Sequence, residues 1–322
     1  MAVAVRSFAK INFGLEIGPK RADGFHFLRT VYQTVALHDR LRIEVSPGTG
    51  IEIRSNDARV PLDETNTCWR MAERAMKALK ASGRVVIQIE KDLPIQGGLG
   101  GASSNAVATL LAIERAVGKH LPPQERLGLA AEIGSDLPLF LIGGTVLGTG
   151  RGEEVYPLEE LPALDCVIVT PEIGISTPQA FAALDTLREK TGKLTAAAAS
   201  DTLISSSHAL SAWLSGSSTG VPAKGSGDRA EALLLDLVHA GIENDFESVV
   251  FPQHPELRDV KQALERTGAA YASLSGSGST VYGLFKSREL ARKAAKRLQA
   301  EGMLAVATRM LTRREYWKRM FE

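Results

Sequence analysis

A run of glycine and serine between two regular segments is the feature that most constrains the fold of this chain. The run, Gly97–Ser104, follows the alternating apolar pattern of Arg84–Glu90 and precedes an amphipathic pattern over Asn105–Val117. The first pattern predicts a strand and the second a helix, which Gly118 is well placed to end. Glycines let the backbone turn tightly and approach a ligand, and the free N–H groups of a helix start favour an anion. The sequence therefore predicts a strand–loop–helix unit able to bind phosphate.

Taken alone, this glycine loop does not identify a ligand, because a strand–helix turn with a serine cap explains the same residues equally well. The loop is not a P-loop, since no Gly-Lys-Ser or Gly-Lys-Thr ending is present, and Ser103 stands where the dinucleotide fingerprint has its last glycine. The HRD and DFG motifs of protein kinases are also absent. A helix dipole contributes only about 0.3–1 kcal/mol, so phosphate binding needs the loop amides and hydroxyls as well.

The remaining periodicity predicts a mixture of strands and helices. In the first half, we expect strands at Val3–Phe8, Lys10–Ile17, Leu28–Ala36, Leu41–Ser46, Ile51–Arg54 and Gly143–Gly148, and helices at Thr67–Leu79 and Pro122–Ile133. In the second half, we expect strands at Asp165–Thr170, Tyr271–Ser275, Thr280–Phe285 and Leu304–Met310, and helices at Pro178–Glu189, Ala230–His239, Glu256–Thr267 and Arg288–Ala300. This mixture favours an α+β architecture with an antiparallel sheet.

The length of 322 residues is large for one core, so we expect two domains that share a cleft, at residues 1–160 and 161–322. Residues 190–228 are rich in Ala, Ser and Gly and predict a variable surface excursion without chemistry. A G-x-S-x-G match at Gly216–Gly220 lies in this excursion and lacks the strand–turn–helix setting of a hydrolase nucleophile.

The charge balance favours a small-molecule partner. Lys and Arg number 38 against 37 Asp and Glu, which leaves a net charge of +1 and no basic stripe for nucleic acid or an anionic membrane. No apolar stretch is long enough to span a bilayer, and the first residues do not resemble a signal peptide. Cys68 and Cys166 lie in separate apolar contexts, which predicts buried thiols in a reducing compartment. We therefore expect a cytoplasmic protein, a monomer or weak homodimer.

Three further features are ambiguous when each is taken alone. Ser273–Thr280 is a second glycine and serine cluster between two expected strands, which a glycine hairpin would explain. Asp136 precedes an apolar run and is equally a turn or cap residue, and Lys10 is equally an outward-facing strand residue. The six histidines are scattered, so we expect no transition-metal site. Two serine and glycine loops in one chain nevertheless favour a phosphate-lined cleft.

Together these segments resemble the GHMP kinase superfamily, whose phosphate loop has the form Pro-x-x-x-Gly-Leu-Gly-Ser-Ser. The corresponding residues run from Pro94 to Ala106. Within the superfamily, several segments are similar to the kinases that act on 4-diphosphocytidyl-2-C-methyl-D-erythritol in the non-mevalonate route to isoprenoids. These segments are Ala9–Leu15, Arg21–Leu28, Asp39–Leu41, Asn244–Glu247 and Ser275–Gly278.

The resemblance implies a two-domain α+β fold, with a ribosomal-protein-S5-like N-terminal domain and a ferredoxin-like C-terminal domain. It implies transfer of the γ-phosphoryl group of ATP to the 2-hydroxyl of the substrate, with Mg²⁺ bridging the phosphates and no side chain assigned to the metal. Asp136 would accept the hydroxyl proton, and Lys10 beside it would keep the carboxylate ionised and steady the phosphoryl oxygens. The residues expected at ATP are Asn66, Pro94, Gly97, Gly98, Leu99, Gly100, Gly101, Ala102, Ser103 and Ser104. The assignment of Asn66 is weakened by the Thr67-Cys68 that follows it.

The resemblance also assigns residues to the cytidyl substrate. Asn12 would hold the erythritol hydroxyls, and His26 would read the cytosine edge by hydrogen bonding. Phe25 stands where the family usually has tyrosine, so a stacking face remains while a hydroxyl is lost. Phe181 would supply a second aromatic face from the other domain, and such stacking is worth roughly 1–3 kcal/mol per base. The remaining substrate residues are Thr177, Gly276 and Ser277.

Other functions stay open at this point. A GHMP kinase for another alcohol, of the mevalonate or homoserine type, is the second reading, although it leaves Asp23–His26 without a purpose. A nucleotide-binding protein that has lost catalysis, or a nucleic-acid module, is the third. The retained Lys10 and Asp136 argue against lost catalysis, and the near-zero net charge argues against nucleic acid.

Overall fold

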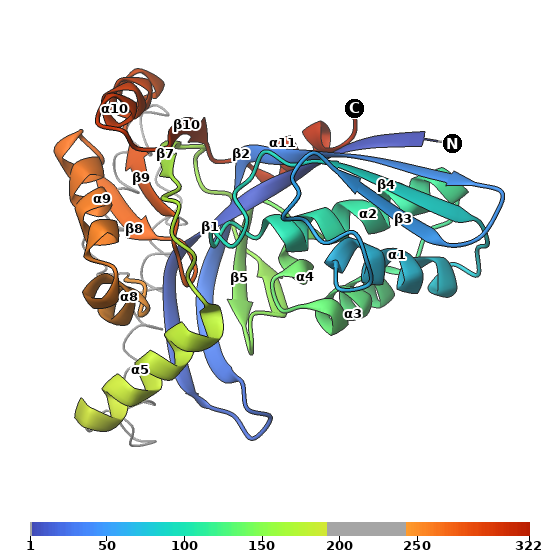
Figure 1. Cartoon of the computed structure of the whole chain (residues 1–322), viewed down its shortest axis with the longest axis horizontal. Coiled ribbons are helices and arrows are strands. Elements are labelled where there is room, and N and C mark those ends of the chain that lie inside the picture. The colour runs from blue at the N-terminus through green and yellow to red at the C-terminus, as the bar shows by residue number, and fades with distance from the viewer. Residues whose placement is uncertain (1, 192–242) are drawn as a thin grey trace.

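Two long antiparallel strands organise the molecule. β1 (Ala2–Lys20) and β2 (His26–Ser46) pair along nearly their whole length and run across both halves of the computed structural model (Figure 1). The structure describes residues 2–191 and 243–322, so the expected helix at 230–239 and nearly all of the expected excursion at 190–228 lie outside the described residues. The shorter strands expected near the N-terminus are segments of β1 and β2; they are Val3–Phe8, Lys10–Ile17, Leu28–Ala36 and Leu41–Ser46. One of the register shifts in this pairing, between Phe8 and Lys10, lies at the expected break between two strands.

The N-terminal half is a mixed sheet covered on one face by helices. β3 (Ile51–Ser55), β4 (Arg84–Glu90), β5 (Thr145–Thr149) and β6 (Glu154–Pro157) extend the sheet from β2, in the order β3-β4-β2-β5-β6. Helices α1 (Thr67–Ala78), α2 (Gly101–Val117), α3 (Pro123–Ile133) and α4 (Leu137–Phe140) lie on one face of it (Figure 1). Gly118 ends α2 with φ +67°, as expected. The predicted start of α2 at Asn105 is wrong, because the helix begins within the glycine loop.

The C-terminal half is a four-stranded antiparallel sheet in the order β10-β7-β9-β8. Its strands are β7 (Asp165–Val169), β8 (Tyr271–Leu274), β9 (Val281–Phe285) and β10 (Ala305–Arg309). Helices α5 (Thr177–Thr191), α8 (Glu247–Gln253), α9 (Pro255–Arg266) and α10 (Arg288–Ala300) complete this half (Figure 1). The four strands were all expected, whereas α8 was not. The two-sheet α+β architecture predicted from the sequence is confirmed.

The inner faces of the two sheets pack against each other. Ile11 and Phe13 of β1 share a buried core with Ile168 of β7 and Leu284 of β9. A buried hydrogen bond also crosses this core, because the hydroxyl of Tyr282 donates to the backbone oxygen of Asn12 over 2.7 Å. The apolar face of β1 is therefore fixed against the second half of the chain, and Lys10 and Asn12, which alternate with Ile11 and Phe13, lie on the opposite face of the strand.

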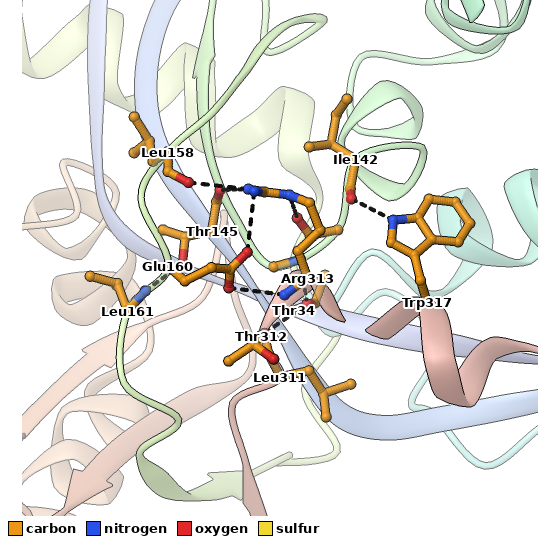
Figure 2. A network of polar contacts seen from close by, with 12 residues as sticks. Thr34, Ile142, Thr145, Leu158, Glu160, Leu161, Leu311, Thr312, Arg313 and Trp317 are labelled. Atoms are coloured by element: carbon orange, nitrogen blue, oxygen red, sulfur yellow. Dashed lines mark hydrogen bonds and ion pairs between the residues drawn. The ribbon is translucent and has the colours of Figure 1, made fainter. Parts of the chain in front are cut away.

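The C-terminal helix α11 (Arg313–Met320) packs on the N-terminal half rather than extending into solvent. Arg313 is its anchor: the guanidinium donates to the backbone oxygens of Gly143, Thr145 and Leu158 over 2.9–3.2 Å and pairs with Glu160 at 3.2 Å (Figure 2). The indole of Trp317 donates to the backbone oxygen of Ile142 over 3.0 Å. The basic C-terminal helix is thus a structural clamp on the N-terminal half. No helix in the described part of the chain is long and apolar enough to cross a membrane.

Candidate active site

The glycine loop has a backbone that only glycine allows at two positions. Gly98 and Gly100 have φ of +77° and +69°. A Cβ atom on Gly98 would clash with the backbone oxygen of Ser275, and one on Gly100 would lie 2.9 Å from the ring of Phe140. The glycines are therefore required by the loop conformation and by the close approach of the second half of the chain.

The two serine and glycine loops meet at this place. The Ser275 hydroxyl donates to the backbone oxygen of Gly98 over 3.0 Å, and the Thr280 amide donates to the backbone oxygen of Gly97 over 3.2 Å. From the other side, the amide of Lys10 donates to the backbone oxygen of Leu99 over 2.9 Å. The hairpin 273–280 and the glycine loop thus form one continuous wall beside Lys10.

Lys10 and Asp136 lie together at this wall. The Lys10 ammonium is 3.4 Å from one carboxylate oxygen of Asp136 and donates to the side-chain oxygen of Asn12 over 2.8 Å. The Lys10 side chain is 4% exposed, whereas that of Asp136 is 35% exposed. A buried cation beside a more accessible carboxylate places a proton acceptor where an alcohol can reach it.

Tyr32 is a site residue that the sequence analysis missed. Its hydroxyl donates to the other carboxylate oxygen of Asp136 over 3.1 Å. Burial, and secondarily the neighbouring Asp136 charge, raises the pKa of Tyr32 well above its ordinary value, so the hydroxyl stays a donor. Tyr32 pairs with Asn12 across β1 and β2. Correct pairing of these strands would have brought it to Asn12 and Lys10, but periodicity alone does not give strand register.

Two cavities meet at the glycine loop. One, of about 560 Å³, is lined by most of the expected catalytic and substrate residues, and the other, of about 460 Å³, is lined by most of the expected ATP residues. Gly98, Gly100 and Thr177 line both cavities. The first cavity contains Lys10, Asn12, Phe25, His26, Asp136, Phe181, Gly276 and Ser277, and the second contains Asn66, Pro94, Gly97, Leu99, Gly101, Ala102 and Ser103.

The aromatic end of the larger cavity is arranged differently from the expected sandwich. Phe181 stacks on His26, with ring centroids 4.9 Å apart and planes at 13°. Phe25 lies apart, 52% exposed, with the guanidinium of Arg151 4.9 Å from its ring. The ring faces that Phe181 and His26 turn toward each other are therefore not open to a base. Phe25 keeps an exposed face.

Asp185 is a second residue that the sequence analysis missed. The Nε2–H of His26 donates to its carboxylate over 2.8 Å, and Asp185 lines the same cavity. Asp185 lies four residues after Phe181 on α5, so both side chains share one helix face. This spacing was visible in the sequence, but nothing local linked it to His26.

Four side chains expected to contact ATP or the substrate, three hydroxyls and one amide, instead form hydrogen bonds within the protein. The Ser104 hydroxyl accepts from Ser7 over 2.7 Å, and the hydroxyls of Thr177 and Ser277 lie 2.7 Å apart. Asn66 caps α1, where its side-chain oxygen accepts from the Cys68 amide over 2.9 Å and its nitrogen donates to a backbone oxygen. Ser103, by contrast, lines the smaller cavity at the first turn of α2.

Buried groups brace the glycine loop from behind. Asp39 is fully buried and accepts from the Lys91 ammonium over 2.7 Å, the Asn105 amide over 2.9 Å and the Leu93 backbone over 2.7 Å. Its carboxylate thus joins the segment that follows β4 to helix α2. Burial raises the pKa of the Cys68 thiol to about 12, so this thiol, which lines the smaller cavity, stays protonated at neutral pH. Cys68 and Cys166 are both free and buried, as expected.

Within residues 2–191 and 243–322, no three His, Cys, Asp or Glu side chains gather as a metal site.

Comparisons with known proteins agree with this geometry. The family model for the N-terminal domain of GHMP kinases matches residues 66–144, and the model for their C-terminal region matches residues 228–303. A relative from Solibacter usitatus (strain Ellin6076), named 4-diphosphocytidyl-2-C-methyl-D-erythritol kinase, is 37% identical over 98% of this chain and 92% of its own length. A relative of the same name from Nocardia farcinica (strain IFM 10152) is 35% identical over 94% of this chain and 91% of its own length.

Solved structures show the same fold. A crystal structure of 4-(cytidine 5'-diphospho)-2C-methyl-D-erythritol kinase superposes with a TM-score of 0.71 at 27% identity, covering 95% of this chain and 98% of the other. Homoserine kinase from Cytophaga hutchinsonii ATCC 33406 superposes with a TM-score of 0.73 at 21% identity, covering 97% of this chain and 95% of the other. The likeness to homoserine kinase is one of fold alone.

Proposed function

The chain belongs to the family of 4-diphosphocytidyl-2-C-methyl-D-erythritol kinases, within the GHMP kinases, and we infer that it transfers the γ-phosphoryl group of ATP to the 2-hydroxyl of that cytidyl alcohol. The observation that carries this inference is the position of Lys10 and Asp136, which lie 3.4 Å apart in the cavity that adjoins the glycine loop. An acceptor hydroxyl beside Asp136 and a phosphoryl group at the loop would then be neighbours. The reaction is one step of the non-mevalonate route to isoprenoid precursors.

Asp136 is the proposed proton acceptor. A phosphoryl transfer has little covalent chemistry for the protein to perform, so alignment, charge neutralisation and one base are the main requirements. The Tyr32 hydroxyl and the Lys10 ammonium hold the two oxygens of Asp136 from different sides. Lys10 keeps the carboxylate in its ionised form and offers a positive charge to the transferring phosphoryl oxygens.

The smaller cavity is the proposed ATP site. The amides of Gly97–Ala102 and the Ser103 hydroxyl border it, and the start of α2 adds its dipole, so the triphosphate would find donors on one wall. Mg²⁺ is proposed to bridge the phosphates, because Mg²⁺ prefers phosphate and water oxygens and stabilises the charge that develops on them. Asn66 is proposed to border the ATP site without a free side-chain amide, because both polar atoms of that amide are hydrogen-bonded at the start of α1.

The larger cavity is the proposed site of the cytidyl alcohol. Asn12, whose oxygen is held by Lys10 and whose nitrogen donates to Thr30, is fixed to hold the erythritol hydroxyls. Phe25 offers the exposed stacking face, and His26 is held by Asp185 and Phe181. We place the cytosine ring against Phe25, with His26 reading its edge. Both halves of the cleft come from one chain, so we also propose a monomer or weak homodimer that works in the cytoplasm, where ATP is supplied.

A phosphorylation panel tests this function. Purified protein with Mg²⁺ and ATP is offered 4-diphosphocytidyl-2-C-methyl-D-erythritol, mevalonate and homoserine, and ADP release is measured. We expect turnover of the cytidyl alcohol alone. Turnover of mevalonate or homoserine without the cytidyl alcohol would refute the substrate and leave a GHMP kinase for another alcohol. Absence of turnover with all three, despite ATP binding, would favour a silent nucleotide-binding protein.

A further inference from the structure

A third cavity, of about 330 Å³, lies away from the catalytic cleft and is unusually rich in arginine. None of its lining residues lines either of the two cleft cavities. In Figure 1, α10, β10 and α11, which surround it, are at the upper edge of the view, whereas α5, which borders the catalytic cleft, is at the lower left. The arginines are Arg288 and Arg292 of α10, Arg309 of β10 and Arg319 of α11.

The fold explains both the hollow and its charge. Ala36, Ala291 and Ala307 line the cavity, and their methyl groups are too short to fill the space where α10, the β7–β10 sheet and β2 come together. Arg288 and Arg292 are one turn apart on α10, so they share a face of the helix. Arg309 pairs with Asp165 in the β10–β7 register and approaches the cavity from the sheet.

The arginine charge is only partly neutralised. Arg309 and Arg319 share one carboxylate, Glu315, at 3.1 and 3.7 Å. Asp165 is the acidic residue of the lining, and it interacts electrostatically with Arg309, Arg288 and Arg292. Four guanidinium groups against these two carboxylates leave an excess of two positive charges. Within the described residues, neither Arg288 nor Arg292 has a carboxylate at ion-pair distance.

We propose that this arginine cavity is a second ligand site of the protein, which binds the diphosphate group of a small molecule outside the catalytic cleft. Guanidinium groups recognise phosphate oxygens in a planar, two-point manner that lysine cannot reproduce. The cavity presents two pairs of them, Arg288 with Arg292 on one wall and Arg309 with Arg319 on the other, so each pair can take one phosphoryl group. The alanine methyl groups would border a short organic substituent.

Isothermal titration calorimetry with inorganic pyrophosphate, at low ionic strength and without Mg²⁺, tests the proposal. The wild-type chain is compared with Arg288→Ala/Arg292→Ala and with Lys293→Ala/Lys296→Ala. The lysine pair lies on the same helix, is exposed, does not line the cavity and carries the same charge change. Any binding in the catalytic cleft is common to all three proteins, because every substitution lies outside that cleft. The difference therefore reports the arginine cavity.

We expect the arginine variant to lose at least tenfold in affinity at one site, while the lysine variant binds as the wild type does. Equal losses in the two variants, or no loss in the arginine variant, would overturn the proposal. Circular dichroism checks that α10 stays folded. Arg309→Lys keeps the positive charge but loses the planar, two-point hydrogen bonding of the guanidinium group, so it should weaken binding as well. Orthophosphate binding as tightly as pyrophosphate would refute a diphosphate site. If propyl diphosphate binds more tightly than pyrophosphate, the ligand of this cavity is an organic diphosphate ester. If the two bind equally, the ligand is inorganic pyrophosphate.

Discussion

Asp136 illustrates how this site depends on single residues held from several elements. The residue stands directly before α4, where it makes no side-chain cap, and its two oxygens instead meet Tyr32 of β2 and Lys10 of β1. A helix-start aspartate normally serves its own helix. Here the carboxylate instead contacts partners more than a hundred residues away in sequence, which is the arrangement that the proposed proton acceptor requires.

Asp136→Ala should lower kcat by about 10²–10⁴-fold, because a general base acts in the transition state and contributes little to nucleotide binding. Steady-state kinetics give kcat, and fluorescent-nucleotide titration gives the ATP affinity, which we expect to change little. Tyr32→Phe, which removes the donor but keeps the ring, should lower kcat by a smaller factor. A near wild-type rate in Asp136→Ala would remove this residue from the mechanism.

Phe25→Ala should raise KM for the cytidyl substrate about five- to 160-fold, because a base stacked on the ring is worth roughly 1–3 kcal/mol. KM for ATP should stay nearly constant. Phe27→Ala is the matched control: Phe27 is also exposed and also carries an arginine over its ring, but it does not line the cavity. Equal effects of the two substitutions on both substrates would make Phe25 a packing residue.

Cys68 gives a pH dependence whose sign follows from its burial. Burial raises its pKa from an ordinary 9.0 to about 12, so between these values the unfolded chain binds fewer protons than the folded one. The free energy of unfolding should therefore be unaffected below pH 9 and fall as the pH rises from 9 towards 12, by up to about 1.4 kcal/mol per unit. Urea unfolding at pH 8, 9 and 10 measures the slope. Cys68→Ser, which does not ionise there, should show a shallower slope, and identical slopes would contradict the assignment.

At the scale of elements, periodicity predicted most strands and helices but not the contacts between them. The strand–loop–helix around Gly97–Ser104 and the end of α2 at Gly118 were visible because their signals are local. The missed elements α4, β6, α8 and α11 are short, with 4, 4, 7 and 8 residues, so each offers little periodicity to detect. The contacts of His26 with Asp185 and of Tyr32 with Asp136 join residues 159 and 104 positions apart. Such pairings are fixed by sheet register and helix docking, which sequence periodicity does not report.

Arg313 lets the clamp function of α11 be tested. Arg313→Ala removes the donor to three backbone oxygens and the partner of Glu160, and we expect a loss of about 2–4 kcal/mol in the free energy of unfolding. Urea titration followed by circular dichroism measures it. Arg314→Ala, at the exposed neighbouring position, should cost less than about 0.5 kcal/mol. A loss in Arg313→Ala no larger than in this control would mean that the network does not anchor the helix.

At the scale of the whole molecule, the two halves are joined by more than a shared cleft. β1 contributes Phe8 to the N-terminal core, Ile11 and Phe13 to the core between the sheets, and Leu15 and Ile17 to the C-terminal core. The expected boundary after residue 160 falls between β6 and β7 in the chain and stays a prediction. Because β1 belongs to all three cores, however, we expect neither half to have a complete core of its own.

This sharing predicts a single cooperative unfolding transition for the whole chain. In a Trp213→Phe variant the two remaining tryptophans, Trp69 and Trp317, pack against the N-terminal core and report its loss by fluorescence, whereas circular dichroism reports helices of both halves. The two signals should change together in urea, because losing either half exposes the apolar face of β1 and β2 that the other half covers. The fragment 161–322, which lacks Leu15, Ile17 and the facing sheet, should be unfolded when it is expressed alone. Separate fluorescence and dichroism midpoints, together with a folded fragment, would show that the halves are independent domains.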